Sequence, residues 1–215
     1  MAPSFVQIAQ IDVPSAGTSP YTVAFGSNNT VGNLLFFAMR NSTSSFVSVG
    51  DSQVNTYTQL ENDANLIVFF SKNCKAGANT VTVTTGSTNC QCLIAEYSGV
   101  DLVTATDQTG TPASATSTTA TTNSITTVAN SELVLSIIKN TTTNTPTYTP
   151  SGGFSSTRNA GHNIDVCDFV QASAGAINMS YALGGSYAWS VNIFSFLSSS
   201  TGIATHQQLR RRREM

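Results

Sequence analysis

The feature that most constrains the fold is an uninterrupted apolar run, Leu34–Met39 (LLFFAM), which follows a polar, turn-like segment at 27–30. A strand with one face in water alternates apolar and polar residues, whereas a strand that is apolar at every position must be covered on both faces. Leu34, Phe36 and Ala38 are expected to point to one side and the alternate residues to the other. The run therefore predicts a central strand buried between two layers.

Two further segments, Leu66–Phe70 and Leu133–Ile138, have the same two-faced character, with Ser136 as the single polar residue in the second. Both are bounded by polar, turn-rich stretches, as buried strands usually are. We expect these segments to form the central strands of two packed sheets. Their outward-facing side chains are expected to be covered by a loop or by another subunit.

The rest of the chain shows short alternating segments between turn residues, and helical periodicity is absent before the last fifteen residues. We predict a hairpin between Phe46–Val49 and Asn55–Leu60, and a closing hairpin between Ile177–Leu183 and Tyr187–Leu197 through two glycines. The Thr-rich segment 109–122 is either a flexible linker or a long extended connection or edge strand. We predict the second because a strand pattern resumes directly after it.

These patterns predict an all-β fold: a two-sheet antiparallel β-sandwich, jelly-roll-like, with about twelve short strands. We expect one domain over residues 1–200 and a basic tail over 201–215. Charged residues are 9% of the chain, against roughly 25% in an ordinary soluble protein, and Thr, Ser, Asn and Gln supply the polarity instead. Such a surface depends little on salt and is typical of a protein exposed to the exterior.

The N-terminus has neither the basic region nor the apolar region of a secretion signal. No stretch approaches the roughly 18 apolar residues of a membrane-spanning helix. A virion component would be assembled in the host cytoplasm and released by lysis, without a signal. We therefore predict a virion location and no membrane partner, with an extracellular protein whose signal has been removed as the alternative.

The chain has four cysteines, which are Cys74, Cys90, Cys92 and Cys167. A domain of this size does not need disulfides, so buried or free thiols are one interpretation. The other is up to two disulfides, with Cys74 and Cys90 as the most reasonable pair because they flank one strand. The spacing gives little support to a zinc site.

Few residues suggest catalysis, and we predict no catalytic residue, no metal site and no cofactor. No Gly-x-Ser-x-Gly motif or phosphate-binding loop is present. Asp165 and Asp168 could in principle form the carboxylate pair of a glycosidase, but solvated or turn-bonding carboxylates are the stronger interpretation. Glu96 lies within an apolar strand and, if buried, needs a partner such as Arg40 or Lys72.

Two weaker binding signals come from scattered residues. Aspartates that fall in loops could hold calcium, but they do not form an Asp-x-Asp-x-Asp cluster; they are Asp51, Asp63, Asp101 and Asp107. Aromatic residues could stack on sugars if they were exposed, and the candidates are Tyr57, Tyr148, Tyr181, Tyr187 and Trp189. We expect Trp189 to be part of the core.

The C-terminal tail is the most unusual feature of the charge distribution. It contains Arg210, Arg211, Arg212 and Arg213, which are four of the nine basic residues. The chain through Leu209 then has five basic and ten acidic residues, a net charge of −5, since Glu214 is the eleventh acid. Arginine binds carboxylates bidentately and stays charged, so we predict that these four residues bind a protein partner. Nucleic acid is the weaker expectation, because four arginines on an acidic domain make a small footprint.

Five segments in order resemble a β-sandwich domain family of bacterial extracellular and bacteriophage virion proteins, whose members read GNLL…DSxxNTYT…AEYSGxD. The segments begin at Gly32, Val49, Ala95, Glu132 and Gly153, and the resemblance covers about residues 5–197. The sequence departs from the family at Val54, where a glycine is usual. The resemblance implies a jelly-roll-like module and carries over no catalytic residue.

We therefore expect a non-enzymatic virion structural protein of a bacteriophage, such as a capsid decoration (cement) protein or another surface accessory protein. Its expected partners are other virion proteins, of the capsid shell or further copies of itself in a homo-oligomer. The alternative is a secreted carbohydrate-binding or adhesin module, and a hydrolase is a distant third.

Overall fold

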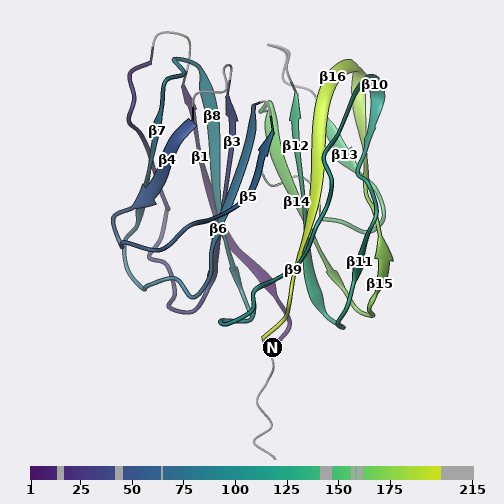
Figure 1. Ribbon diagram of the computed structural model, residues 1–215, viewed down its shortest axis with the longest axis horizontal. Helices are drawn as coiled ribbons and strands as arrows, with labels where there is room; N and C mark the ends of the chain where they lie inside the picture. Colours follow the sequence, from purple (N-terminus) through teal and green to yellow (C-terminus); the bar gives the residue numbers. More distant parts are fainter. Residues whose placement is uncertain are drawn as a thin grey trace, which may run out of the picture.

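The computed structural model describes residues 1–13, 17–41, 46–63, 65–140, 147–155, 158 and 162–199. This part of the chain forms sixteen strands, all of them paired antiparallel, and contains no helix (Figure 1). The predicted all-β, antiparallel, jelly-roll-like fold is confirmed, although the strands and sheets are more numerous than expected. Accordingly, the described residues include no helix long and apolar enough to cross a membrane.

Two large sheets lie at the centre of the molecule. The first has the strand order β1 (Ser4–Val13), β8 (Cys90–Ser98), β3 (Leu34–Asn41), β6 (Leu66–Ser71), β5 (Thr58–Asp63). The second has the order β10 (Ala113–Thr121), β16 (Ser180–Phe196), β12 (Glu132–Asn140), β14 (Ile164–Gln171). Two short strands, β9 (Thr106–Thr109) and β13 (Tyr148–Pro150), also pair with β16.

Two small sheets lie outside the large ones. One has the order β2 (Tyr21–Ala24), β7 (Thr80–Thr85), β4 (Phe46–Asp51), and the other pairs β11 (Ile125–Thr127) with β15 (Gly175–Ile177). Figure 1 shows β4 and β7 at one side of the molecule, β11 and β15 at the other, and the large sheets between them.

Alternate side chains of the central strands lie in different hydrophobic cores, as predicted from their uninterrupted apolar sequences. Leu34, Phe36 and Ala38 of β3 lie in the core between the two large sheets, together with the alternate residues of β6, β8 and β12. Leu35 and Phe37 lie in a second core, which the β2-β7-β4 sheet closes. A third core lies on the outer face of β12 and contains side chains from β10, β11, β13 and the first half of β16.

The cover of the two-faced strands therefore comes from the chain itself. Val81 and Val83 of β7 pack on the outer face of the first large sheet, and Tyr148 and Tyr181 pack on that of the second. All four side chains are buried. A second subunit is not needed to bury the apolar runs, so these runs do not argue for an oligomer.

The two halves of the chain have the same topology. In the first half the large sheet has the order β1-β8-β3-β6, and in the second half the order is β10-β16-β12-β14. The outer strands correspond as well: β7, which begins at Thr80 and pairs β2 and β4, has its counterpart in the first part of β16, which begins at Ser180 and pairs the end of β10 and β13. Each half thus has the two-sheet strand arrangement of a jelly roll, and the two jelly rolls share the core between the large sheets.

The register and the sequence agree with a duplication. Arg40 faces Leu66 and Gln91 across its neighbouring strands, and Lys139, 99 positions later, faces Ile164 and Ser190. The next residue is Asn41 in one half and Asn140 in the other; their backbone N–H groups donate to Asn65 O at 3.0 Å and to Asn163 O at 2.8 Å. An Ala-Gly-Ala sequence follows in both halves, at 76–78 and at 174–176.

Corresponding turns of the two halves are also built alike. The hydroxyl of Ser52 accepts a hydrogen bond from the backbone N–H of Thr80 at 3.0 Å, and that of Ser151 accepts one from the N–H of Ser180 at 3.1 Å. The backbone N–H groups of the two serines donate back to the same residues. We conclude that the chain is two structurally equivalent jelly rolls in tandem.

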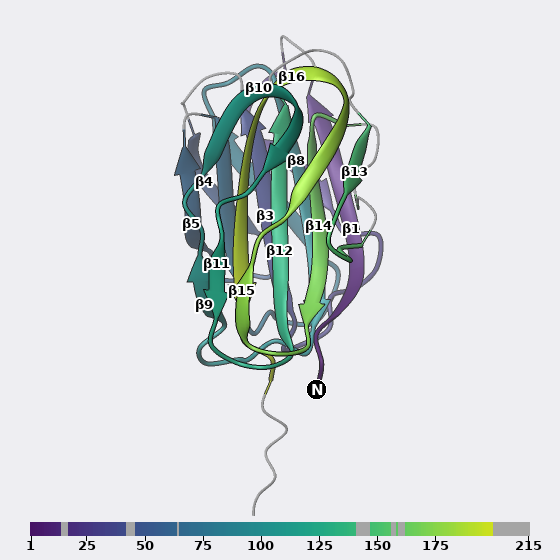
Figure 2. The same cartoon turned by 90° about the vertical axis from the view of Figure 1, so that its right-hand side faces the viewer.

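Both predicted hairpins are wrong. β4 pairs β7 and β5 pairs β6, so the turn at 51–56 passes between sheets. The glycines at 184 and 185 lie within β16, whose two parts both pair with β10 and not with each other. The pairs Ser117–Tyr187 and Thr119–Ala182 bracket a bulge, and Figure 2 shows β10 and β16 arching together there. The prediction that segment 109–122 contains an edge strand is confirmed by β10.

Candidate functional site

The turn between β4 and β5 carries the best-defined motif of the sequence, and Asp51 organises it. Its Oδ1 accepts the backbone N–H of Asn55 at 2.9 Å, and its Oδ2 accepts the side chains of Asn55 at 2.8 Å, Tyr57 at 2.9 Å and Asn79 at 3.0 Å. Burial by itself raises the pKa of Asp51, but these hydrogen bonds outweigh it and hold the pKa below its ordinary value. The carboxylate that was a calcium candidate is therefore occupied in fixing the turn.

Val54 lies at the tip of the same turn in a left-handed conformation, with φ of +56°, and 76% of it is exposed. This region costs an L-residue about 1–2 kcal/mol, and a β-branched residue there is a true outlier. The structure thus keeps the glycine-type turn that the family resemblance implies, although the glycine is absent. The exposed side chain gains no packing in return.

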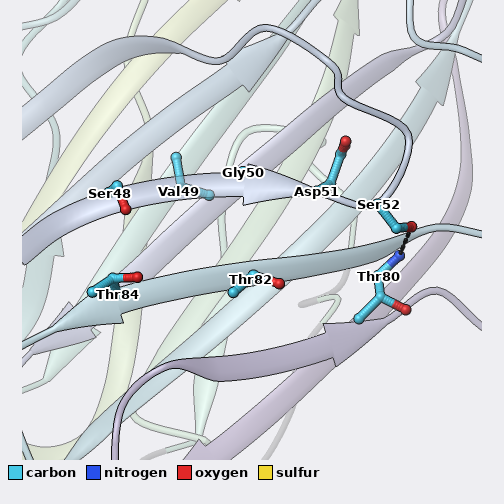
Figure 3. A pocket seen from close by; sticks show the side chains of 8 residues that line it. All are labelled: Ser48, Val49, Gly50, Asp51, Ser52, Thr80, Thr82 and Thr84. Atoms are coloured by element: carbon cyan, nitrogen blue, oxygen red, sulfur yellow. Dashed lines mark hydrogen bonds between the residues drawn. The ribbon is translucent and has the colours of Figure 1, made fainter.

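A shallow groove of about 480 Å³ lies next to this turn, on the outer face of β4 and β7 (Figure 3). Its wall is formed by hydroxyl-bearing residues, together with Gly50, where an added Cβ would meet no atom within 4 Å. The lining residues are Ser48, Val49, Gly50, Asp51, Ser52, Thr80, Thr82 and Thr84. The groove offers hydroxyl donors and acceptors and one carboxylate that is already hydrogen-bonded.

Glu96 is completely buried beneath the turn between β2 and β3. Its Oε1 accepts the backbone N–H of Thr30 at 2.9 Å and Asn33 Nδ2 at 2.6 Å; its Oε2 accepts Gln7 Nε2 at 2.6 Å and Asn29 Nδ2 at 2.7 Å. Four N–H donors replace the water that the carboxylate loses. The predicted burial is correct, but the partners are amides and not Arg40 or Lys72. The site holds a loop in place and leaves no oxygen open to a substrate.

The equivalent place in the second half holds Glu132, which is also buried. Its Oε1 accepts the backbone N–H of Ala129 at 2.7 Å. Burial raises the pKa of Glu132, and the nearby carboxylate of Asp107 raises it further, against the lowering effect of hydrogen bonds from Ala129 and Ser195. Asp107, another calcium candidate, itself accepts the backbone N–H of Val128 at 3.0 Å.

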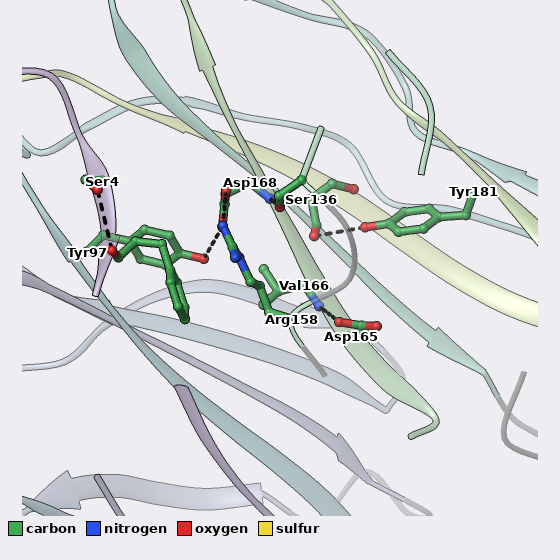
Figure 4. A network of polar contacts seen from close by, with 10 residues as sticks. Ser4, Tyr97, Ser136, Arg158, Asp165, Val166, Asp168 and Tyr181 are labelled. Carbon is green, nitrogen blue, oxygen red and sulfur yellow. Dashed lines mark hydrogen bonds and ion pairs between the residues drawn. The ribbon is translucent and has the colours of Figure 1, made fainter. Parts of the chain in front are cut away.

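The two aspartates of the glycosidase hypothesis have separate environments (Figure 4). Asp168 forms a bidentate ion pair with Arg158, whose Nε and Nη2 lie 2.7 and 2.8 Å from its oxygens, and it accepts the hydroxyl of Tyr97 at 3.3 Å. Arg158 also lies 4.1 Å over the ring of Phe5. Asp165 is buried on the other face of β14, and its Oδ1 accepts the N–H of Val166. The pair faces opposite sides of one strand and does not flank a common cleft.

The remaining candidates are dispersed. His162 lies between Asp12, whose carboxylate is 2.7 Å from Nδ1, and the amide of Gln10 at 2.5 Å from Nε2. Asp101 accepts the backbone N–H groups of Val103 and Thr104, and the side chain of Asp63 lies outside the described residues. Within the described ranges, no three His, Cys, Asp or Glu side chains gather in a way that could hold a metal ion.

The four cysteines are buried free thiols, and the expected Cys74–Cys90 disulfide is not formed. The backbone of Cys74 bonds to Asn33 at the start of β3, whereas Cys90 pairs with Asn41 at its end. At about 3.3 Å per residue, these eight positions separate the cysteines by roughly 26 Å, far beyond the reach of about 7 Å for a disulfide. Burial raises the pKa of Cys74 to about 12, so this thiol is inert at neutral pH.

Three of the five aromatic candidates are buried, and the other two, Tyr57 and Tyr187, are half-buried. Trp189 is 8% exposed, as expected for a core residue, and its Nε1 donates to Ser117 Oγ at 3.0 Å. Tyr148 and Tyr181 are buried against each other with ring centroids 6.0 Å apart. Among the described residues the exposed large apolar side chains are all aliphatic, so none of the aromatic candidates is fully exposed for stacking on a sugar.

Exposed aliphatic side chains gather instead at one end of the first half. Val31, Val54, Leu102 and Val103 project from the loops that follow β2, β4 and β8. An added Cβ at Gly32 would lie 3.6 Å from Leu102, and Val54 and Leu102 line one pocket. We call this group, together with the lysines at 72 and 75, the loop-end patch; sequence analysis did not identify it, and the only signal was valine at the usual glycine position.

The loop-end patch adjoins both ends of the described chain. The amino group of Met1 donates to the carbonyl of Ser199 at 2.9 Å, and the N–H of Ser199 donates to Gly99 O at 2.7 Å, next to the loop that carries Leu102. Figure 1 shows the N-terminus at the same end of the molecule. The four arginines at 210–213, which are predicted to bind a partner, lie outside the described residues.

Comparison with known proteins finds a similar solved structure and no related sequence. No family model and no curated protein matches the sequence. Among solved structures, the chain is similar to the major capsid protein P2 from bacteriophage PM2, with 8% identity and a TM-score of 0.28, over 91% of this chain and 99% of that chain. At this identity and TM-score the similarity does not bear on function. The strand arrangement confirms the jelly-roll-like fold that the family resemblance implied, and membership of that family stays a prediction.

Proposed function

We propose that this chain is a non-enzymatic structural protein of a bacteriophage virion, attached to the particle surface as a capsid decoration or other accessory protein. The observation that carries the proposal is the loop-end patch, where four exposed aliphatic side chains and two exposed lysines project from neighbouring loops, near Ser199 at the end of the described chain. Exposed apolar residues grouped in this way mark an interaction surface.

Three of the carboxylates singled out in the sequence support the same proposal, because hydrogen bonds or an ion pair within the chain occupy them. Asp51 and Glu96 each accept four hydrogen bonds from groups that fix loops, and Asp168 is paired with Arg158. A carboxylate engaged in this way has a structural role that needs no substrate. The tandem jelly roll supports the proposal at the level of architecture, because jelly rolls are common in both viral capsids and lectins.

Attachment would stabilise the particle by linkage. A protein that binds only the assembled shell shifts the assembly equilibrium in favour of that shell. The described body supplies the apolar contact, and the tail at 206–215, with a formal charge of +3 from four arginines and Glu214, supplies attraction to an acidic neighbour.

The test is particle occupancy. Full-length protein and a variant with Arg210, Arg211, Arg212 and Arg213 replaced by glutamine are incubated with particles that lack the chain, across a salt series. We expect the wild type to bind more at low salt and to lose occupancy as salt rises, and the variant to bind weakly at every salt concentration. Equal occupancy with the same salt dependence would contradict a role for the tail, and no binding by either protein would contradict the virion role.

The hydroxyl-lined groove on β4 and β7 favours one second candidate, a secreted carbohydrate-binding or adhesin module. Serine and threonine hydroxyls can exchange hydrogen bonds with sugar hydroxyls. A glycan array distinguishes the candidates: specific glycan binding that is lost in Thr82→Val would favour this function over the first.

A further inference from the structure

A second pocket, of about 270 Å³, lies within the loop-end patch. It is bounded by the turn after β4, the turn after β6 and the segment after β8. Its lining residues are Val54, Asn55, Thr56, Thr58, Lys72, Asn73, Lys75 and Leu102. The pocket therefore brings two aliphatic side chains together with two ammonium groups and two side-chain amides.

The two ammonium groups are held in place by the loops. Lys72 Nζ donates to the carbonyl of Val103, and Lys75 Nζ donates to the carbonyl of Val54 at 3.0 Å. An ammonium group has three N–H donors, so each lysine retains donors for a ligand. The third lysine of the described chain, Lys139, is 4% exposed, which makes this pocket the place where the described surface presents lysine. The carboxylate of Asp101 lies close enough to interact with Lys72 but does not line the pocket.

Backbone strain is concentrated at the same place. Val54 and Asn73, which both line the pocket, have positive φ angles of 56° and 53°. Asparagine tolerates this region, but valine does not. The equivalent turn of the second half has glycine at 153, with φ of +83°. Strained residues occur where the surroundings or a ligand compensate for the strain, and Val54 is 76% exposed, so its side chain gains little packing within the described chain.

We propose that this pocket binds an acidic peptide segment of a protein partner. A carboxylate of the segment lies between Lys72 and Lys75, and an aliphatic side chain beside it covers Val54 and Leu102. Burial of the two aliphatic residues supplies the apolar contribution, and the paired lysines select the acidic neighbour. The inference deepens the proposed attachment role by naming the chemistry of the partner.

The same observations disfavour the other occupants. A second copy docking through the same patch would bring two pairs of lysines together, and like charges repel. Two lysines make a small footprint for nucleic acid, whose binding grows with the number of phosphate contacts. An anionic membrane would meet the carboxylate of Asp101 beside exposed Val103. These occupants become outcomes of the test.

The test uses the full chain with its four tail arginines replaced by glutamine, so that the tail does not bind the probe. The probe is a fluorescent, terminally blocked peptide with the sequence Glu-Leu-Glu-Leu-Glu, measured by anisotropy at low salt. We expect Lys72→Gln with Lys75→Gln to weaken binding by about tenfold or more, the size expected for losing charge pairs at a contact. Leu102→Ser is expected to weaken it by about threefold.

Val47→Ser is the matched control, because Val47 is a similarly exposed valine, at 66%, that does not line the pocket. It should leave the affinity unchanged, and circular dichroism checks that every variant is folded. Absence of peptide binding, or binding that ignores the two lysines, overturns the proposal. Lysine-dependent binding to phosphatidylserine vesicles or to an RNA oligonucleotide in place of the peptide also overturns it. The particle experiment does not depend on this result, since the tail could attach the protein without the pocket.

Discussion

The two halves of the molecule differ in the strand that supplies a buried carboxylate to the turn before the central strand. In each half a turn precedes the central strand, with Gly32 at φ of +88° in the first and Ser131 at +61° in the second. A buried carboxylate lies beneath each turn. In the first half Glu96 supplies it from β8, and in the second half Glu132 supplies it from β12.

The two buried carboxylates do not lie at equivalent positions of the two halves. In the first half Glu96 of β8 pairs with Leu35 of β3, and at the equivalent position of the second half Ser195 pairs with Val134 of β12. The second carboxylate, Glu132, lies instead at the position equivalent to Asn33. The fold therefore needs a buried acceptor for the N–H groups of the turn but does not specify the strand that provides it. The free energy of burying the charge differs between the two carboxylates. Glu96 has four N–H donors, whereas Glu132 has fewer donors and lies near Asp107.

The largest expected effect tests whether the halves are independent. Phe36 is completely buried in the shared core, with its ring centroid 6.3 Å from that of Phe194 in the other half. Phe36→Ala should lower the free energy of unfolding by about 4 kcal/mol. Because both halves use this core, we expect a single unfolding transition that shifts as a whole in urea, followed by fluorescence and circular dichroism. Two transitions, with only one of them shifted, would show that the jelly rolls fold separately.

The next effect concerns the first carboxylate. Glu96→Gln replaces one acceptor oxygen by an NH₂ group that faces the N–H donors of its neighbours. Hydrogen bonds to a charged acceptor are each worth about 1.5–3 kcal/mol, so we expect a loss of about 3 kcal/mol in urea unfolding at pH 7. Glu61→Gln is the control, since Glu61 is half-buried on the edge strand β5 and accepts Asn192 Nδ2 at 2.6 Å. A loss for Glu96→Gln no greater than that for the control would contradict the role assigned to the hydrogen bonds.

Glu132→Gln should raise the free energy of unfolding at pH 7, whereas Glu96→Gln should lower it. Burial raises the pKa of Glu132 in the folded protein above its unfolded value, so the folded state binds the proton more tightly. This contribution to stability is complete below the unfolded pKa and is lost as pH rises through the folded pKa. The glutamine variant has no such loss, and we expect it to be about 1 kcal/mol more stable at pH 7 than the wild type, the size typical of point mutants.

The same difference should shrink as the pH falls to 4, because the side chain of the unfolded wild type then becomes mostly protonated as well. Thermal unfolding of both proteins between pH 4 and pH 8 measures it. A difference that does not change with pH would show that ionisation of Glu132 is not its cause.

The smallest expected effect comes from a substitution that makes a turn of the first half more like its counterpart in the second half. Val54→Gly introduces the residue that the second half has at Gly153. Relief of the left-handed valine is worth about 1–2 kcal/mol, and the extra freedom of glycine in the unfolded chain offsets about 0.5–1 kcal/mol. We expect a net gain of roughly 0.5–1 kcal/mol in urea unfolding. Val47→Gly, within strand β4, should instead destabilise. A loss of stability in Val54→Gly would show that the turn is not strained.

Local patterns predicted the central strands well. The runs at 34–39 and 66–70 became β3 and β6, with their two faces in different cores, because alternation along a strand is a local property. The hairpins were wrong because turn residues mark a change of direction and do not specify the partner strand. The chain at Gly50–Gln53 leaves one sheet for another, and Gly184 and Gly185 form a bulge within one strand.

The duplication and the candidate site depend on contacts between distant segments. The repeat had a signal in the sequence, in Arg40-Asn41 and Lys139-Asn140 at a spacing of 99 and in two Ala-Gly-Ala segments. The burial of Glu96 could be predicted from its apolar neighbours, but its amide partners could not, because they come from a loop about 65 positions away. The loop-end patch had the weakest signal, since an exposed valine has the same sequence appearance as a buried one.

Electron microscopy of the native particle tests the central claim most directly, because it shows whether the chain is an attached surface protein and which end makes the contact. The account predicts density for the tandem jelly roll on the particle, with Val31, Val54, Leu102 and Val103 facing a neighbouring protein and the tail continuing into that contact. Absence of the chain from purified particles, or its attachment through the opposite end with the loop-end patch in solvent, would contradict the account.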